Sequence, residues 1–281
     1  MEKKLKMKII RVPIPTPTLW PNTTTNCYLI GNERECIMVD AGFDQPVTKE
    51  LLEVAIQLHQ LAIPKSIVLT HYHLDHAPGI RQLMDWSPTV FCHKNERQAV
   101  LDSIHPWDDL LCLEDGDFLS IAGEVIKVIH APGHTTGHLN LYIPSEKTLI
   151  SGDNLVAEGT SWIGPPDGDM SDYLQTLTSL KQLNLEKIAP GHGDWIHSPY
   201  EHIDFVLNRR LQRESQILSL LQEFNQLTSL ELTELIYQNH IHPSVFDVAK
   251  RTIEAHLIKS IKDGHIIKHG TFYSILLKRF N

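Results

Sequence analysis

Three histidines and an aspartate lie together in the run HYHLDH at residues 71–76. Imidazole and carboxylate groups are the side chains that hold zinc and related divalent ions. A short loop can direct several such groups toward one point. We therefore predict a metal site whose ligands include His71, His73, Asp75 and His76. A histidine-rich loop without function is the alternative, since 17 of the 281 residues are His, but composition alone rarely produces this spacing.

Three more candidate ligands follow apolar runs later in the chain. Each stands beside a glycine, which lets the backbone turn sharply, in Pro132-Gly133-His134, Gly152-Asp153 and Gly191-His192. Taken singly, each of them is weak. Together with the histidine loop they form a set of seven metal-ligand candidates.

These side chains must be positioned by the elements that precede them. Residues 66–70 (SIVLT) form an apolar, β-branched run of the kind found in buried strands, and it ends at the histidine loop. Similar runs at 124–130, 147–151 and 187–189 precede the other three candidates. Strands come first in hairpin-like runs and later mix with helices, such as those predicted at 47–61 and 172–183. This order favours a layered α/β body with mixed sheets.

From about Pro199 onward, the sequence pattern becomes helical. Apolar residues repeat with helical spacing at 200–225 and 245–261, and Thr228 with Glu231 fits a capping box. Two short strands are predicted at 265–268 and 272–277. Helices followed by a hairpin are typical of a winged helix. We therefore predict a catalytic domain at residues 1–198 and a C-terminal winged-helix domain at residues 199–281.

The basic residues of this tail have two interpretations. Lys250, Arg251, Lys259 and Lys262 would suit a helix that binds nucleic acid, or they form the solvated face of an amphipathic helix. Residues 199–281 contain 10 Lys and Arg against 9 Asp and Glu, so this tail carries +1 and residues 1–198 carry −10. An acidic body repels polyanions. A packing or dimerisation module is the favoured interpretation.

The cysteines and the hydropathy of the sequence indicate in which cellular compartment the protein is expected. The four cysteines, Cys27, Cys36, Cys92 and Cys112, are well separated and include no C-x-x-C pair, so free thiols are expected. The basic start lacks the apolar segment of a secretory signal, and no run approaches membrane-spanning length. We expect a cytoplasmic protein without a membrane partner. Its oligomeric state is open.

The ordered series Asp40, HYHLDH, His134, Asp153 and His192 resembles the five motifs of the metallo-beta-lactamase superfamily over residues 8–198. The resemblance implies an αββα sandwich with a two-metal site at the edge of its two sheets. It implies that the first metal is bound by His71, His73 and His134, and the second by Asp75, His76 and His192. Asp153 would bridge the two metals. Asp40 would orient these ligands. His138 is expected to support a ligand or line the pocket.

Two divalent ions in such a site would activate a bridging water and polarise the bond that is cleaved. Asp75 would act both as a ligand and as a group that orients or transfers a proton. Zinc is the first expectation for the two metals, and iron or manganese would suit the same ligands. No serine or cysteine nucleophile is required.

Departures from the superfamily pattern indicate which branch of the superfamily this chain resembles. Zinc beta-lactamases often use Cys or lack the bridge where this chain has Asp153, which disfavours antibiotic hydrolysis. The Arg209-Arg210-x-x-Arg213-Glu214 helix resembles the group with a C-terminal winged helix, which includes an endoribonuclease and acyl-carrier thioesterases. The pocket after Asp153 is expected to be walled by Gly159, Trp162, Ile163, Pro165 and Pro166, with packing as the alternative role of Trp162.

Three functions compete. The first is hydrolysis of an ester or thioester, with a small-molecule or acyl-carrier substrate. The second is a metal-dependent endoribonuclease acting on single-stranded RNA. The third is a non-catalytic winged-helix binding protein with a structural metal, which the number of ligand candidates disfavours because a closed zinc site needs four.

Overall fold

A computed structural model describes residues 6–18, 23–237 and 241–276 of the chain. It divides into two compact units. The first unit comprises Met1–Ala131, Gly137–Gly159 and Leu183–Pro199. The second comprises Pro132–Thr136, Thr160–Gln182 and Tyr200–Asn281, so it includes two segments that precede the C-terminal region.

The first sheet of the first unit has six strands in sequence order. They are β1 (Lys8–Pro15), β2 (Thr24–Gly31), β3 (Cys36–Val39), β4 (Ser66–Val68), β5 (Thr89–His93) and β6 (Leu110–Leu113). The pairs up to β3 are antiparallel and those from β3 to β6 are parallel. Strand β4 lies within the run 66–70 that the sequence predicts as a strand. Strand β6 was not predicted.

The second sheet has five strands in the order β11-β10-β9-β8-β7. They are β7 (Phe118–Ile121), β8 (Glu124–His130), β9 (Leu139–Ile143), β10 (Thr148–Gly152) and β11 (Lys187–Pro190). Only β10 and β11 pair in parallel; the other pairs are antiparallel. The parallel pair places the carboxyl ends of β10 and β11 side by side, so the residues after them start from the same edge.

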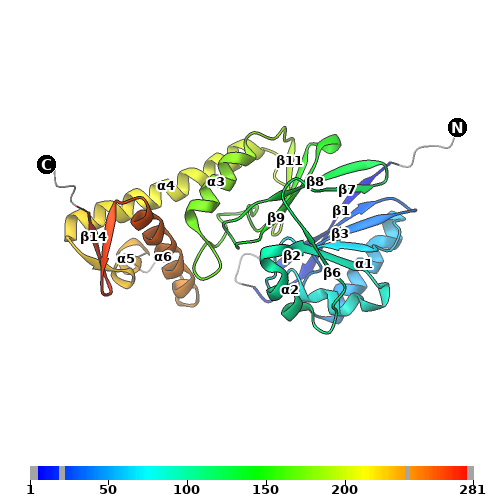
Figure 1. Ribbon diagram of the computed structural model, residues 1–281, viewed down its shortest axis with the longest axis horizontal. Helices are drawn as coiled ribbons and strands as arrows, with labels where there is room; N and C mark the ends of the chain where they lie inside the picture. Colours follow the sequence, from blue (N-terminus) through cyan, green and yellow to red (C-terminus); the bar gives the residue numbers. More distant parts are fainter. Residues whose placement is uncertain (1–5, 19–22, 238–240, 277–281) are drawn as a thin grey trace. The chain divides into compact units, whose positions relative to one another are not determined.

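Two apolar clusters hold the first unit together. Side chains of both sheets meet in one of them, which includes Tyr28, Val68 and Leu141. The other lies between the six-stranded sheet and its helices, α1 (Pro46–His59), α2 (Arg97–Ile104) and the 3-10 helix η1 (Pro78–Trp86). Figure 1 shows α1 and α2 beside this sheet. Two short 3-10 turns, η2 (Lys94–Glu96) and η3 (Pro144–Glu146), complete the unit. Its layers are therefore helix, sheet and sheet.

The second unit contains a helical core with a small sheet. Its helices are α3 (Met170–Leu180), α4 (Pro199–Phe224), α5 (Ser229–Tyr237), the 3-10 turn η4 (Pro243–Val245) and α6 (Phe246–Lys262). Strands β12 (Leu227–Thr228), β13 (Ile266–His269) and β14 (Phe272–Ile275) pair in the order β12-β14-β13. The apolar face of α4 packs on α5 and α6 through residues such as Ile217, Leu232 and Ile253 (Figure 1). The predicted strand at 272–277 extends past residue 276, outside the described residues.

All four cysteines carry free thiols, and only Cys112 is exposed. No helix within the described ranges combines the length and the apolar character needed to cross a lipid bilayer.

Candidate metal centre

Asp40 connects the histidine loop to the end of β3. Its buried carboxylate accepts hydrogen bonds from the backbone N–H of Thr70 at 2.7 Å and from Nδ1 of His76 at 2.8 Å. The Oγ1 of Thr70 also lies 2.9 Å from Asp40 Oδ2 and 3.0 Å from Nδ1 of His71. One carboxylate thus holds both ends of the loop that leaves β4.

Four predicted ligands from three strand ends converge at one point in the first unit. Nε2 of His76 lies 3.3 Å from Asp153 Oδ1 and 3.6 Å from Asp75 Oδ2. Nε2 of His192 lies 3.3 Å from Asp75 Oδ2 and 3.3 Å from Asp153 Oδ2. Two imidazole nitrogens and two carboxylates that face one another at these distances form a donor set suited to a divalent cation.

Hydrogen bonds at the far side of each ring fix which nitrogen faces this point. Nδ1 of His76 donates to Asp40, and Nδ1 of His192 donates to the carbonyl of Thr24 at 2.8 Å. Because carboxylates and carbonyls only accept, Nδ1 is the protonated nitrogen of each neutral ring, and Nε2 offers its lone pair once the ring has lost its second proton. Nε2 of His76 is buried and has no hydrogen-bond partner among the described residues. A buried polar atom without a partner costs free energy, so these residues fit a metal ion.

His71 and His73 lie next to this group on the same loop. Nε2 of His71 is 3.0 Å from Nδ1 of His73, and the two rings meet edge to face. His71 also approaches His76, with 4.2 Å between ring centroids. Two further imidazole nitrogens are therefore directed at one position.

The site requires a glycine where two strand ends come closest. A Cβ on Gly191 would lie 2.3 Å from Oδ1 of Asp153, closer than two such atoms can approach. The backbone N–H of Gly191 donates to the carbonyl of Gly152 at 2.8 Å. This close approach allows His192 and Asp153 to reach the same point.

The charges of the site are strongly coupled. Burial opposes the ionisation of Asp75, but the neighbouring His76 and His192 outweigh it and hold the pKa of Asp75 below its usual value. Burial likewise opposes the charging of His192, but Asp153 and Asp75 raise the pKa of His192 to about 10. Without a cation, protons balance the two carboxylates; a metal ion would replace those protons.

His134 belongs to the second unit. It is buried, and its Nδ1 donates a hydrogen bond to the carbonyl of Trp162 at 2.8 Å, so its Nε2 carries the lone pair. His138 lies in the first unit, where its Nε2 accepts from the backbone N–H of Asp153 at 3.1 Å and its ring stacks on His71. His138 therefore supports the Asp153 turn.

Sequence reasoning missed two side chains that contact the site. Thr25 on β2 donates to Asp75 Oδ2 at 2.9 Å. Glu96 is buried at the start of α2 and accepts from the backbone N–H groups of Tyr72 at 2.8 Å and Gly137 at 3.0 Å. In the sequence, Glu96 is a single carboxylate after an apolar strand. This pattern is common in surface turns, so it does not indicate a contact with the site.

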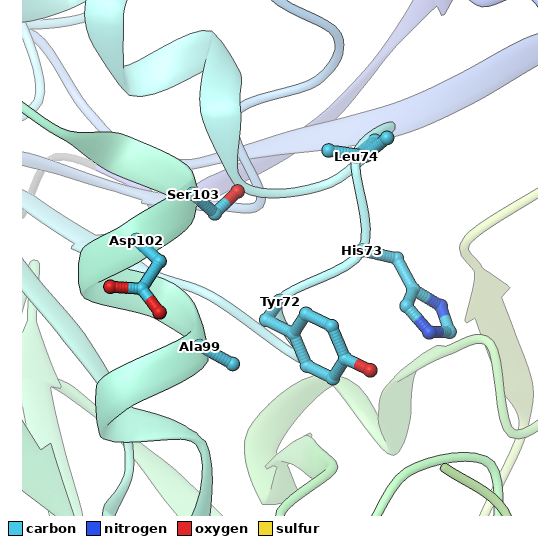
Figure 2. A pocket seen from close by; sticks show the side chains of 6 residues that line it. All are labelled: Tyr72, His73, Leu74, Ala99, Asp102 and Ser103. Carbon is cyan, nitrogen blue, oxygen red and sulfur yellow. The ribbon is translucent and has the colours of Figure 1, made fainter. Parts of the chain in front are cut away.

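A cavity of about 370 Å³ opens beside His73. Figure 2 shows the loop residues on one side of it and α2 on the other. Its lining comprises Tyr72, His73, Leu74, Ala99, Asp102 and Ser103. The predicted pocket residue Trp162 is not part of this lining. The lining contains no lysine or arginine, and Leu74 is 70% exposed at its mouth.

Comparison with known proteins extends these findings. The sequence model described as "Metallo-beta-lactamase superfamily" matches residues 20–192. The "Beta-lactamase-like protein 2 homolog" of Caenorhabditis elegans is 30% identical over 271 residues, which cover 93% of this chain and 87% of that protein. An "Atrochrysone carboxyl ACP thioesterase" of Aspergillus fumigatus is 26% identical over 79% of this chain and 67% of that protein. The crystal structure of a metallo-beta-lactamase family protein from Thermus thermophilus is similar in fold, with a TM-score of 0.79 at 22% identity over 95% of this chain and 98% of that one.

Proposed function

The chain belongs to the metallo-beta-lactamase superfamily of hydrolases, and we propose that it cleaves an acyl thioester or ester with the help of two divalent metal ions. The observation that carries this proposal is the convergence of the His76 and His192 Nε2 atoms on the carboxylates of Asp75 and Asp153, whose side chains are only 15% and 13% exposed. No serine or cysteine is needed for such a site to hydrolyse an acyl bond.

We assign the ligands as follows. Asp75, His76 and His192 would hold one metal, His71, His73 and His134 would hold the other, and Asp153 would be shared between them. Support for including His134 comes from its loop, whose two ends are joined by a 2.8 Å hydrogen bond from Ala131 N–H to the His138 carbonyl. Zinc, iron and manganese all suit imidazole and carboxylate ligands. When bound, the two ions would lower the pKa of a water molecule and polarise the acyl carbonyl.

The surrounding residues orient the ligands and handle the proton. Asp40 fixes His76 through Nδ1 and, through Thr70, the start of the loop. Thr25 fixes one oxygen of Asp75. We propose that the Asp75 carboxylate accepts the proton released when water attacks the carbonyl, and passes it to the thiolate or alkoxide that leaves, which departs as the thiol or alcohol.

The cavity beside His73 favours an apolar acyl group. Tyr72, Leu74 and Ala99 supply apolar surface within reach of a proposed ligand, and the charged residue of the lining, Asp102, is acidic. An acyl chain gains free energy from burial against such side chains. A polyanion would meet no compensating cation there. The thioesterase name of one relative agrees with this substrate class.

The C-terminal region gives little support to the alternative function, that of an endoribonuclease. We propose that α5, α6 and the hairpin of β13 and β14 form a winged helix that serves packing. The basic residues that would suit nucleic-acid binding all have partners within the chain. Lys250 pairs with Glu254 at 2.9 Å, Lys259 pairs with Glu214 at 2.9 Å, Lys262 pairs with Asp169, and Arg251 donates to the Pro165 carbonyl at 3.4 Å. The neighbouring carboxylates lower the net positive charge that a phosphate backbone would meet on this surface.

The test compares two substrates with the metal-loaded protein: a medium-chain acyl thioester and a single-stranded RNA. We expect cleavage of the thioester, reduced at least about 100-fold by Asp75→Ala and unchanged by Asp85→Ala, a surface carboxylate that pairs with Lys49. Cleavage of RNA alone, abolished by Asp75→Ala, would replace our substrate assignment with the endoribonuclease.

A further inference from the structure

Arg210 is a buried cation in the second unit that the proposed chemistry does not use. It lies on α4 and is 7% exposed. One of its terminal nitrogens, Nη2, donates to the carbonyl of Ser161, and its guanidinium carbon lies 5.7 Å from the centre of the Tyr173 ring. Burying a guanidinium is costly unless its contacts compensate, and an apolar side chain would fill the same space at lower cost. The contacts of Arg210 therefore need an explanation beyond packing.

The carbonyl that Arg210 holds is adjacent to the one that holds His134. Ser161 accepts from Arg210, and the next residue, Trp162, accepts from Nδ1 of His134 at 2.8 Å. Two consecutive peptide groups share a residue, so a rotation that frees one carbonyl also moves the other. The direction of the Trp162 carbonyl decides where His134 is held and which ring nitrogen carries its proton.

A second contact leads from Arg210 to the same loop. Tyr173, beneath the guanidinium, packs so closely on Gly133 that a Cβ there would lie 2.3 Å from the Tyr173 Cα atom. Gly133 directly precedes His134. The guanidinium thus contacts the carbonyl that precedes the His134 partner, and it contacts the ring of Tyr173, the residue that packs on Gly133.

We infer that Arg210 is a positioning residue for metal binding, which holds the Ser161–Trp162 carbonyls so that His134 presents Nε2 to the metal. This inference rests on the proposed function, because it requires His134 to be a ligand. Outer contacts of this kind typically contribute about 10–100-fold to metal affinity. The C-terminal helix α4 would then control a metal ligand that lies 76 residues earlier in the sequence.

The experiment measures metal binding directly. Metal-free wild-type protein and Arg210→Met are titrated with Zn²⁺ by calorimetry, and the ring ¹⁵N resonances of His134 are recorded before metal is added. We expect one of the two sites in Arg210→Met to bind about 10–100-fold more weakly while the other is unchanged. We also expect His134 to lose its single Nδ1–H tautomer. A purely structural role would leave that tautomer intact.

The matched control is Arg213→Met. Arg213 lies on the same helix and stacks on the Tyr237 ring at 4.6 Å, but no hydrogen bond joins it to the 161–162 peptide in the described structure. We expect Arg213→Met to bind both metals with wild-type affinity. If Arg210→Met does not fold, Arg210→Lys supplies the comparison, because it keeps the charge and loses the planar head. Wild-type affinity and an unchanged His134 tautomer in the folded Arg210 variant would overturn the inference.

A third variant separates this inference from the proposed function. If His134→Ala loses one metal but the Arg210 variants do not, the ligand assignment stands and the role of Arg210 is wrong. If His134→Ala binds two metals with wild-type affinity, the ligand assignment itself fails, and the inference fails with it.

Discussion

Thr25 on β2 donates a 2.9 Å hydrogen bond to Oδ2 of Asp75, although 50 residues separate them in sequence. The same oxygen lies 3.3 Å from Nε2 of His192. The threonine hydroxyl therefore restricts the rotation of the carboxylate that we propose as both ligand and proton carrier. Free rotation would let Asp75 adopt orientations in which it cannot transfer the proton.

Replacing Thr25 with Val removes this hydrogen bond and keeps the β-branched shape. We expect kcat for thioester hydrolysis to fall about 10-fold, because a hydrogen bond to a charged group stabilises it by about 1.5–3 kcal/mol and each 1.4 kcal/mol of barrier corresponds to about tenfold in rate. Steady-state kinetics at a fixed metal content measures the change. Thr23→Val, at an exposed position two residues earlier, is the control and should keep the wild-type rate. An unchanged kcat in Thr25→Val would show that Asp75 does not need this restraint.

Ala99 lines the cavity beside His73 from α2 (Figure 2). Replacing it with Phe places a large side chain in the space that we assign to the acyl group. We expect KM for a long-chain acyl thioester to rise about 10-fold, and that for an acetyl thioester to stay near the wild-type value, because only the long chain needs the filled volume. Arg97→Phe, an exposed position on the same helix, controls for the added ring. Equal effects on both substrates would place the acyl group elsewhere.

The ligand candidates could be found from sequence because their signals are local. Each follows an apolar run, and parallel strands such as β10 and β11 bring Asp153 and His192 to one edge, as their positions predict. Strand β6 was missed because two of its four residues are exposed, which gives no clear alternation. Its parallel pairing with β5 depends on residues 20 positions earlier in sequence.

The contacts that hold the ligands could not be read from the sequence. Thr25 reaches Asp75 only through the packing of β2 near the loop, and the partner of His134 is a backbone carbonyl, which every residue possesses. The cavity likewise depends on where α2 lies beside the loop, which no local pattern in the sequence indicates.

His256 on α6 is completely buried, and its charged neighbours are mostly cationic. Arg210 and Arg213 approach it from α4 and Lys259 from α6, while the carboxylate of Glu214 lies 4.0 Å from its Nδ1. Burial, reinforced by these cations, lowers the pKa of His256 to about 3 from the usual 6.5. Between these two values the unfolded chain binds a proton that the folded chain does not. The free energy of unfolding therefore decreases as the pH falls below 6.5.

We expect His256 to reduce the free energy of unfolding by about 1.4 kcal/mol for each pH unit below its unfolded pKa, until its folded pKa is reached. His256→Leu removes the titrating group and should flatten this part of the pH dependence. Urea titrations of the metal-free protein at several values between about pH 4.5 and about pH 7 measure it, with His269→Leu, an exposed histidine on β13, as the control. The His269 variant should keep the wild-type slope, because the His269 side chain is exposed to solvent in the folded protein as well. If His256→Leu kept that slope too, His256 would have to be protonated inside the fold, with its positive charge balanced by Glu214.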